Sequence, residues 1–280
     1  MEARTPSRTA LGVVAHRAVH QIFDAPPKIL GDPIAPSLLS EAERAALAER
    51  PAWIDEPATR RMRARLVVRS RFSEDRLAAA VARGVDQYVI LGAGYDSFAY
   101  RQPAWARGLQ IFEVDHPATQ AEKQARLAAA GVAAPDNLVF APIDFEATSL
   151  AAGLRASALD FDRPAFFSCL GVLVYLTAEA GDAVFQLVAG FPAGSEVAFS
   201  FSPSGDSDVA ARAAAAGEPW LTHHQRSDLA ARLAELGYAE VEFLTPVETG
   251  RLYFPRPRSD GLQAPPRTFV AAAIVGDNAG

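Results

Sequence analysis

Residues 86–96, DQYVILGAGYD, decide the fold of this chain. The short apolar run YVIL leads directly into Gly92, Ala93 and Gly94. This pattern is typical of a buried parallel strand that ends in a tight turn beside a ligand. Glycine lacks a Cβ, so it permits positive φ angles and a close approach of the backbone to a bound molecule. We therefore expect Gly92, Ala93 and Gly94 to line a ligand site.

The next apolar run, residues 109–114, leads into two carboxylates, Glu113 and Asp115. Acidic side chains at the end of the second strand of a parallel sheet accept hydrogen bonds from ribose hydroxyls in many nucleotide sites. The two neighbouring strand ends therefore predict a cofactor that contains a nucleoside, with Glu113 and Asp115 as candidate ribose ligands.

Strand-like and helix-like segments alternate after residue 86, which predicts an α/β fold built on a parallel sheet. The expected strands are 88–91, 109–114, 138–143, 165–170 and 197–201, and the expected helices between them are 117–130, 147–157 and 178–189. Two further strands, 241–244 and 268–275, follow a helix at 227–236 and are joined by the Pro/Arg-rich segment 251–267. The prediction is a mostly parallel seven-stranded sheet with helices on both faces.

The first 85 residues have helical periodicity, interrupted by prolines. We expect helices at 9–23, 42–49, 60–71 and 74–83, with Ser73 as the N-cap of the last one. The chain then divides into a helical cap and cofactor lid (1–85), a cofactor-binding core (86–202), an inserted flap (203–226) and C-terminal strands that complete the sheet (227–280). We interpret all 280 residues as one domain.

Composition restricts the partners and the compartment. The formal net charge is −6, so neither nucleic acid nor an anionic membrane surface is an expected partner. Cys169 is the only cysteine, which excludes an intrachain disulfide and favours a cytoplasmic protein. No apolar run approaches the ~20 residues of a membrane span, and Met1–Arg8 lacks a signal-peptide core.

The glycine motif alone does not identify the cofactor. A dinucleotide fingerprint has the form G-x-G-x-x-G, and Ser97 stands at the third glycine, which argues against NAD and FAD. The third strand leads into Asp144 and Phe145, where an acid can accept from an adenine amino group and an aromatic ring can cover the base. No phosphate-binding G-x-x-x-x-G-K-[ST] pattern occurs.

Several motifs recur in an order that resembles the leucine carboxyl methyltransferase-like family of class I S-adenosylmethionine-dependent methyltransferases. They lie between residues 7 and 202 and are Thr9-Ala10, Arg17-Ala18, Asp32-Pro33, Arg69-Ser70-Arg71-Phe72, residues 87–96, Tyr100-Arg101, residues 113–117 (EVDHP), Lys123, Asp144-Phe145 and residues 172–177 (VLVYLT). The resemblance implies a Rossmann-like fold, S-adenosyl-L-methionine as cofactor and S-adenosyl-L-homocysteine as product. Bacterial members include polyketide carboxyl methyltransferases, which suggests antibiotic biosynthesis.

The resemblance also implies roles for single residues. Arg69 is expected to pair with the methionine carboxylate of the cofactor, as a guanidinium does bidentately. Gly92, Ala93 and Gly94 would line the methionine and ribose, Glu113 and Asp115 would hold the ribose, and Asp144 and Phe145 would face adenine. Leu170 stands where relatives often carry an acid, so a contact to the cofactor's amino group would come from backbone carbonyls or be missing.

The acceptor site is less defined. Arg17, His20 and Tyr175 are the candidates for contact with the methyl acceptor. A carboxylate acceptor is ionised at neutral pH and needs no base, whereas a phenol or alcohol would need one such as His20 or His223. His16 and His20 share a helix face, but no further ligand has a suitable spacing, so we expect no metal site.

Four functions follow from these observations. The leading one is O-methylation of a small natural-product-like molecule, on a carboxylate or a hydroxyl. The others are methylation of a protein C-terminal carboxylate, a non-catalytic S-adenosylmethionine-binding regulator, and an NAD-dependent reductase, which Ser97 argues against. The sequence leaves the oligomeric state open.

Overall fold

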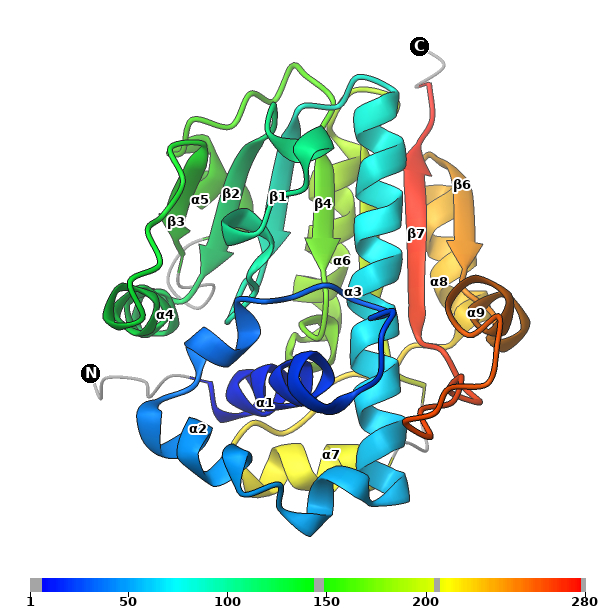
Figure 1. Ribbon diagram of the computed structural model, residues 1–280. Helices are drawn as coiled ribbons and strands as arrows, with labels where there is room; N and C mark the ends of the chain where they lie inside the picture. Colours follow the sequence, from blue (N-terminus) through cyan, green and yellow to red (C-terminus); the bar gives the residue numbers. More distant parts are fainter. Residues whose placement is uncertain (1–6, 144–148, 204–206, 278–280) are drawn as a thin grey trace.

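The computed structural model describes residues 7–143, 149–203 and 207–277, which form one seven-stranded sheet (Figure 1). The strand order is β3-β2-β1-β4-β5-β7-β6, and β7 runs antiparallel to both of its neighbours. The strands are β1 (Gln87–Leu91), β2 (Gln110–Asp115), β3 (Leu138–Pro142), β4 (Phe166–Cys169), β5 (Glu196–Ser200), β6 (Tyr238–Phe243) and β7 (Val270–Val275). The predicted fold class is confirmed.

Strand β1 lies at the centre of the sheet, and its side chains are buried on both faces. Val89 and Leu91 join the larger core cluster on one face, while Tyr88 and Ile90 join a second cluster on the other. This explains why β1 is an uninterrupted apolar run and does not alternate with polar residues. The chain continues from β1 to β2 on one side and from β4 to β5 on the other, so a crevice for ligands is expected at the carboxyl ends of β1 and β4.

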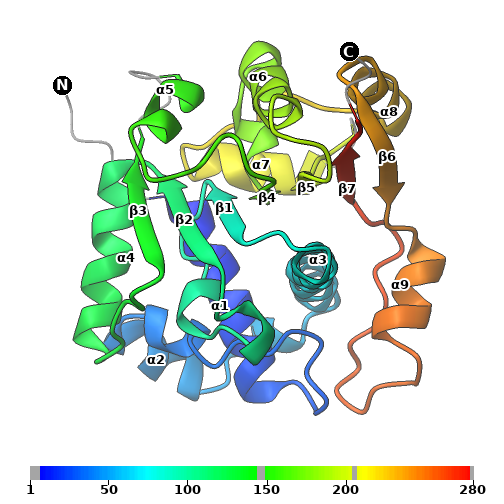
Figure 2. The same cartoon turned by 90° about the horizontal axis from the view of Figure 1, so that it is seen from above.

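Helices cover both faces of the sheet (Figure 2). One face carries α5 (Leu150–Arg155), α6 (Ala178–Ala189) and α8 (Arg226–Glu235), and the other carries α3 (Pro57–Ala82) and α4 (Pro117–Ala129). Beyond the carboxyl ends of the parallel strands lie α1 (Arg8–Phe23), α2 (Glu41–Ala48) and α7 (Ser207–Ala215) (Figure 1). Helix α9 (Pro246–Tyr253) flanks β6 and β7. Short 3-10 helices are η1 (Ala35–Leu38), η2 (Ala52–Asp55), η3 (Phe98–Tyr100), η4 (Ala104–Ala106) and η5 (Leu173–Tyr175).

Helix α3 corrects the prediction of two helices separated at Ser73. It runs without a break for 26 residues, and Ser73 lies buried inside it. Serine only weakly disfavours a helix interior, and packing of apolar residues such as Val67, Phe72 and Leu77 outweighs that preference. Ser73 is therefore not an N-cap.

Helix α9 was not predicted, and it occupies part of the segment expected to be a loop. Its start has a capping box: Thr245 accepts from the backbone N–H of Glu248, and the Glu248 side chain accepts from Thr245. Pro246 is the first helical residue, a position that proline favours. These signals are present in the sequence, but they directly follow the predicted strand 241–244 and were not recognised as the start of a helix. No helix in the described residues is both long and apolar enough to cross a bilayer.

Candidate cofactor and acceptor site

The glycine turn after β1 has the predicted backbone conformation. Gly92 and Gly94 have φ angles of +63° and +50°, a region that residues with a Cβ rarely adopt. A Cβ on Gly92 would lie 2.4 Å from Cγ2 of Val172, and one on Gly94 would lie 3.4 Å from the Cβ of Ala10 in α1. The turn is therefore enclosed by the segment after β4 and by the first turn of α1.

Asp115 fixes this turn from the end of β2. Its carboxylate accepts hydrogen bonds from the backbone N–H of Gly94 and from that of His116, the latter at 2.7 Å. Burial raises the pKa of Asp115, and the two N–H donors oppose that rise. The side chain is only half-buried, so its remaining lone pairs can still accept from a ligand.

Glu113 lies two residues before Asp115 and on the same face of β2, but in a different environment from the one predicted. It is fully buried, and its Oε1 lies 2.6 Å from Nζ of Lys123 in α4, which is also fully buried. Burial raises the pKa of Glu113, and Lys123 counteracts the rise. The structure thus places Glu113 in an internal ion pair and not at a ligand surface, which leaves Asp115 as the ribose candidate.

Arg69 projects from α3 toward the ends of β1 and β4 and has no carboxylate partner among the described residues. Its Nε is buried and makes no hydrogen bond to the described chain. Burial and the neighbouring Arg17 lower the pKa of Arg69 to about 10, so it is charged at neutral pH. Arg69 is only partly exposed, and a cation removed from water in this way without an ion-pair partner is costly, so a carboxylate ligand would relieve that cost.

The segment after β4 packs against Arg69. Gly171 has φ +76°, and a Cβ there would lie 2.9 Å from Nη1 of Arg69. Tyr175, on η5, is half-buried and lies within electrostatic range of the same guanidinium. Leu170 packs against the apolar cluster between α3 and β7 and offers no polar side-chain group. Arg69, Gly171 and Tyr175 therefore lie close together. Asp144 and Phe145, which were expected to face adenine, lie outside the described residues.

His20 is engaged within the cap. It is fully buried; its Nδ1 lies 2.7 Å from Oδ2 of Asp24, and its Nε2 accepts from the backbone N–H groups of Ile29 and Leu30 at 3.1 and 3.4 Å. Both ring nitrogens are therefore in use, with the proton on Nδ1. This arrangement corrects the expectation that His20 contacts the acceptor.

Arg17 is likewise committed to protein groups. Its Nη2 lies 2.6 Å from Oδ2 of the fully buried Asp32 and donates to Ser97 Oγ at 2.8 Å and to the carbonyl of Tyr95 at 3.3 Å. Its Nη1 lies 4.0 Å from Oδ2 of Asp96. Arg17 therefore ties α1 to the loop after the glycine turn, which is a structural role and not the predicted acceptor contact.

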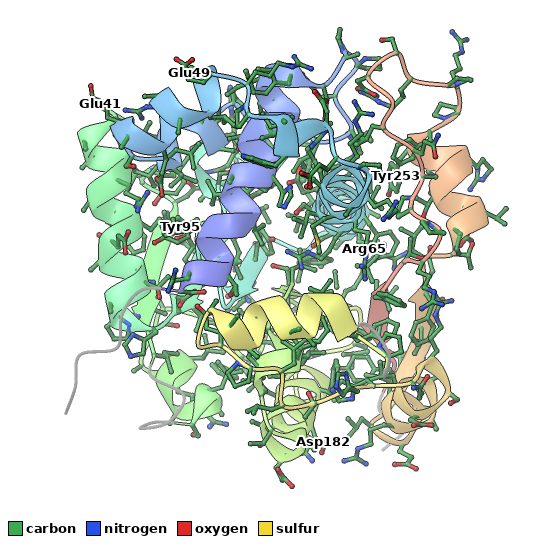
Figure 3. The ribbon with its side chains drawn as sticks, turned by 90° about the horizontal axis from the view of Figure 1, so that it is seen from below. Glu41, Glu49, Arg65, Tyr95, Asp182 and Tyr253 are labelled. Atoms are coloured by element: carbon green, nitrogen blue, oxygen red, sulfur yellow. The ribbon has the colours of Figure 1, made fainter. Side chains whose placement is uncertain are left out.

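A carboxylate that the sequence did not reveal joins the flap to α1. Glu218 accepts from Ser7 Oγ at 2.9 Å, from the backbone N–H of Arg8 at 2.7 Å, and from the hydroxyl of Thr9. The flap also donates from the backbone N–H of Leu221 to the carbonyl of Val174 at 2.7 Å. Figure 3 views this side, where α1 packs against α3 and Arg65 lies on the side of α3 that faces α7.

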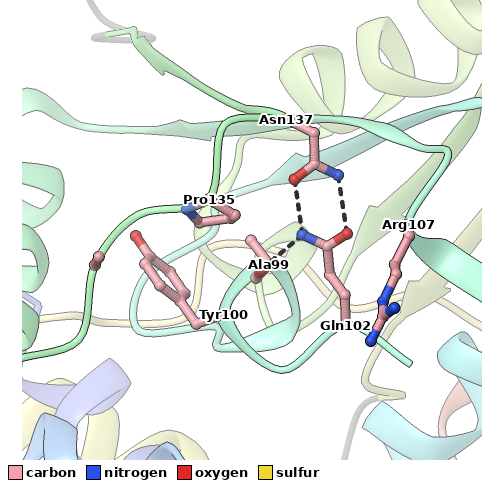
Figure 4. Close-up of a pocket in the computed structure, with 7 residues that line it drawn as sticks. Ala99, Tyr100, Gln102, Arg107, Pro135 and Asn137 are labelled. Atoms are coloured by element: carbon pink, nitrogen blue, oxygen red, sulfur yellow. Dashed lines mark hydrogen bonds between the residues drawn. The ribbon is translucent and has the colours of Figure 1, made fainter. Parts of the chain in front are cut away.

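Two hollows lie outside the glycine turn. One, of about 290 Å³, is lined by residues on the loops that lead into β2 and β3, including Tyr100, Gln102 and Asn137 (Figure 4). The paired amides of Gln102 and Asn137 hold those loops together. The second hollow, of about 270 Å³, lies at the carboxyl end of β5 and is lined by Phe201, Pro203, Gln225, Arg226, Ser227 and Phe269.

Strand order and the glycine turn define a class I methyltransferase fold. A model of the leucine carboxyl methyltransferase family matches residues 10–189. The chain belongs to this family. In the described part of the chain, no group of three His, Cys, Asp or Glu side chains is placed to hold a metal ion.

The relatives agree with the family, and a solved structure shares the fold. A Bacillus subtilis (strain 168) protein named "Putative S-adenosyl-L-methionine-dependent methyltransferase YktD" is 31% identical over 298 residues, covering 94% of this chain and 96% of the relative. A Mycobacterium marinum protein with the same description, without the name YktD, is 33% identical over 266 residues, covering 92% and 86%. A Thermobifida fusca crystal structure titled "putative methyltransferase" has a TM-score of 0.58 at 18% identity and covers 98% and 96% of the two chains, which shows the shared fold.

The protein is therefore an S-adenosyl-L-methionine-dependent methyltransferase. The residues in the structure fit this cofactor. Arg69 is a partly buried cation with no ion pair to the described residues, which suits the cofactor's carboxylate. The Gly92–Gly94 turn permits close approach, and Asp115 is a partly exposed acceptor suited to ribose.

Proposed function

We propose that this enzyme methylates the carboxylate of a small, natural-product-like acid, with polyketide acids as one such class. The observation that carries the proposal is the state of His20. Its two ring nitrogens are both engaged by protein groups, so His20, one of the two histidines predicted as a base, has no free lone pair for a hydroxyl acceptor. The other, His223, is exposed. A carboxylate needs no base, because it is ionised at neutral pH.

The chemistry places few demands on the protein. When bound, the cofactor supplies a methyl group on a sulfonium sulfur: in an in-line displacement the methyl group passes to the acceptor oxygen, and the sulfur leaves as a neutral thioether. The chain's own residues must hold the acceptor oxygen behind that methyl carbon and exclude water. We assign these tasks to the helical cap, to the flap and to Tyr175, which lies beside Arg69.

Two features support a small acceptor with an apolar body. Glu218 ties the flap to the first turn of α1, which narrows access to the strand ends. The hollow at the carboxyl end of β5 is lined by two aromatic side chains, Phe201 and Phe269, and by Arg226. A flat apolar acid suits such a surface better than a protein C-terminus does.

A second candidate, methylation of a phenol or alcohol, is favoured by His224. Its Nε2 is buried and has no hydrogen-bond partner among the described residues, and its backbone N–H donates to the carbonyl of Ser202 just after β5. Burial and the neighbouring His223 lower the pKa of His224, which favours the neutral ring that a general base requires.

A panel of aromatic and polyketide acids, their methyl esters and the matching phenols distinguishes these functions. Product is followed by mass spectrometry together with S-adenosyl-L-homocysteine release. We expect turnover of free acids, no turnover of esters that lack a hydroxyl, and little change in rate between pH 6 and 9. Turnover of phenols alone, with a rate that His224→Gln abolishes and His223→Gln does not, would establish the second candidate instead.

Methylation of C-terminal carboxylates in a peptide library would favour a protein substrate. Tight binding of the cofactor without turnover in any library would indicate a regulatory protein and contradict the proposal.

A further inference from the structure

The head group of the cofactor's methionyl moiety carries two opposite charges, a carboxylate and an ammonium. Arg69 suits the carboxylate, and the ammonium requires an acceptor of its own. Leu170, at the end of β4, cannot provide one through its side chain. The ammonium therefore needs an acceptor from elsewhere, either a backbone carbonyl or another carboxylate, and this question does not depend on which molecule the enzyme methylates.

Asp96 is the carboxylate that acts on Arg69. Among the charges that affect the Arg69 guanidinium, Asp96 is the carboxylate that raises its pKa, in opposition to burial and Arg17. Asp96 follows the glycine turn directly, two residues after Gly94. Its side chain is 21% exposed, so it borders a space open to solvent.

The hydrogen bonds of Asp96 leave acceptor capacity free. Its Oδ1 accepts from the backbone N–H of Phe98 at 2.8 Å. Its Oδ2 has Arg17 Nη1 at 4.0 Å, and the rest of that guanidinium is bound to Asp32, Ser97 and the carbonyl of Tyr95. Oδ2 therefore has only a distant cation beside it.

Arg69 and Asp96 do not touch, although they interact electrostatically. In the described structure, no N–O distance between their side chains falls within 4.0 Å, and Arg69 forms no other ion pair. Two opposite charges held apart in one site match a ligand that carries both complementary charges on adjacent groups. We propose that Asp96 binds the α-ammonium group of the cofactor, opposite Arg69, and so supplies the contact that Leu170 does not.

Asp96 also stabilises the turn through Phe98, so the test must separate that role from ligand recognition. Isothermal titration of Asp96→Asn is performed with S-adenosyl-L-homocysteine and with 5′-methylthioadenosine, which lacks the amino-acid head group. We expect affinity for the first to fall at least tenfold and affinity for the second to stay within twofold. Equal losses for both ligands would show a structural role, and an unchanged affinity for S-adenosyl-L-homocysteine would also overturn the proposal.

A deamino analogue of S-adenosyl-L-homocysteine tests the ammonium directly. The wild-type enzyme should bind it at least tenfold more weakly than the parent ligand, and Asp96→Asn should bind both about equally. A second carboxylate at the end of β4, introduced as Leu170→Glu in the Asp96→Asn background, should restore affinity for the parent ligand and not for the deamino analogue. Discrimination that survives in Asp96→Asn would place the ammonium elsewhere.

Discussion

Gly171 lies directly against Arg69: a β-carbon added at Gly171 would come within 2.9 Å of Nη1 of the guanidinium. This contact can be disrupted by a single added methyl group. Gly171→Ala should push the guanidinium out of position without removing its charge. We expect the affinity for S-adenosyl-L-homocysteine to fall about tenfold, or about 1.4 kcal/mol, as measured by titration calorimetry.

Gly194 provides the matched control for the backbone strain. Its φ is +85°, close to that of Gly171, but no atom lies within 4 Å of a β-carbon there. Gly194→Ala should cost about 1 kcal/mol of stability through the same unfavourable φ and leave cofactor affinity unchanged. Equal affinity losses in both variants would mean that strain alone, and not displacement of Arg69, explains the effect.

Replacement of Arg69 itself should separate binding from stability. Arg69→Met removes the group expected to bind the cofactor carboxylate, so S-adenosyl-L-homocysteine affinity should fall about 100-fold, since a hydrogen bond to a charged group contributes about 1.5–3 kcal/mol. It also removes a partly buried cation that has no ion pair to the described residues, so the unliganded protein should melt about 2–5 °C higher. Scanning calorimetry with and without ligand checks both parts. A lower melting temperature with unchanged affinity would discredit the site.

The Glu113–Lys123 pair yields a prediction about which acid serves the ligand. Lys123→Met leaves the buried Glu113 carboxylate without its partner and should destabilise the fold by about 3–5 kcal/mol. The double variant Glu113→Gln/Lys123→Met should recover most of that loss and bind S-adenosyl-L-homocysteine within about threefold of wild type, whereas Asp115→Asn should lose more than about tenfold. Urea unfolding and calorimetry provide the measurements. A binding defect in the double variant as large as that of Asp115→Asn would return Glu113 to the ribose site.

Asp32 gives a prediction about pH. Burial raises the pKa of Asp32, but Arg17, Arg101 and Ser97 outweigh burial and the pKa ends below its ordinary value. A lowered folded-state pKa adds stability above the unfolded pKa of about 3.9, and this stability is lost as pH falls through the folded value. Asp32→Asn should therefore cost about 3–5 kcal/mol at pH 7 and progressively less below about pH 4. Urea unfolding at several pH values tests this, and a difference independent of pH would contradict it.

The sheet could be predicted from the sequence because its inner strands are buried on both faces. A strand such as β1 must then be apolar throughout and end where glycine permits the turn, so its bounds were predicted within one residue. The positive φ of Gly92 and Gly94 followed from the same pattern. The parallel pairing of the first five strands followed from the alternation of strands with helices.

The partners in the ion pairs could not be predicted, because the sequence does not show which distant residue the fold will bring next to a given charged side chain. Arg17 pairs with Asp32, and Glu113 pairs with Lys123, only because the fold brings them together. His20 was placed on a helix face by periodicity, but its partner Asp24 and the N–H groups of residues 29 and 30 depend on the following turn. Asp96 and Glu218 were missed for the same reason.

Helix α3 connects the two ends of the sheet. At 1.5 Å per residue its 26 residues extend about 39 Å. Toward its C-terminus, Arg76 and Arg83 form ion pairs with Glu196 at the start of β5. Arg69 lies against Gly171, just after the carboxyl end of β4. The position of the Arg69 guanidinium is thus linked, through α3, to ion pairs with Glu196 that lie one or more helical turns further along the helix. Substitutions at Arg76, Arg83 or Glu196 should therefore change the affinity for S-adenosyl-L-methionine without any change in the residues that contact it.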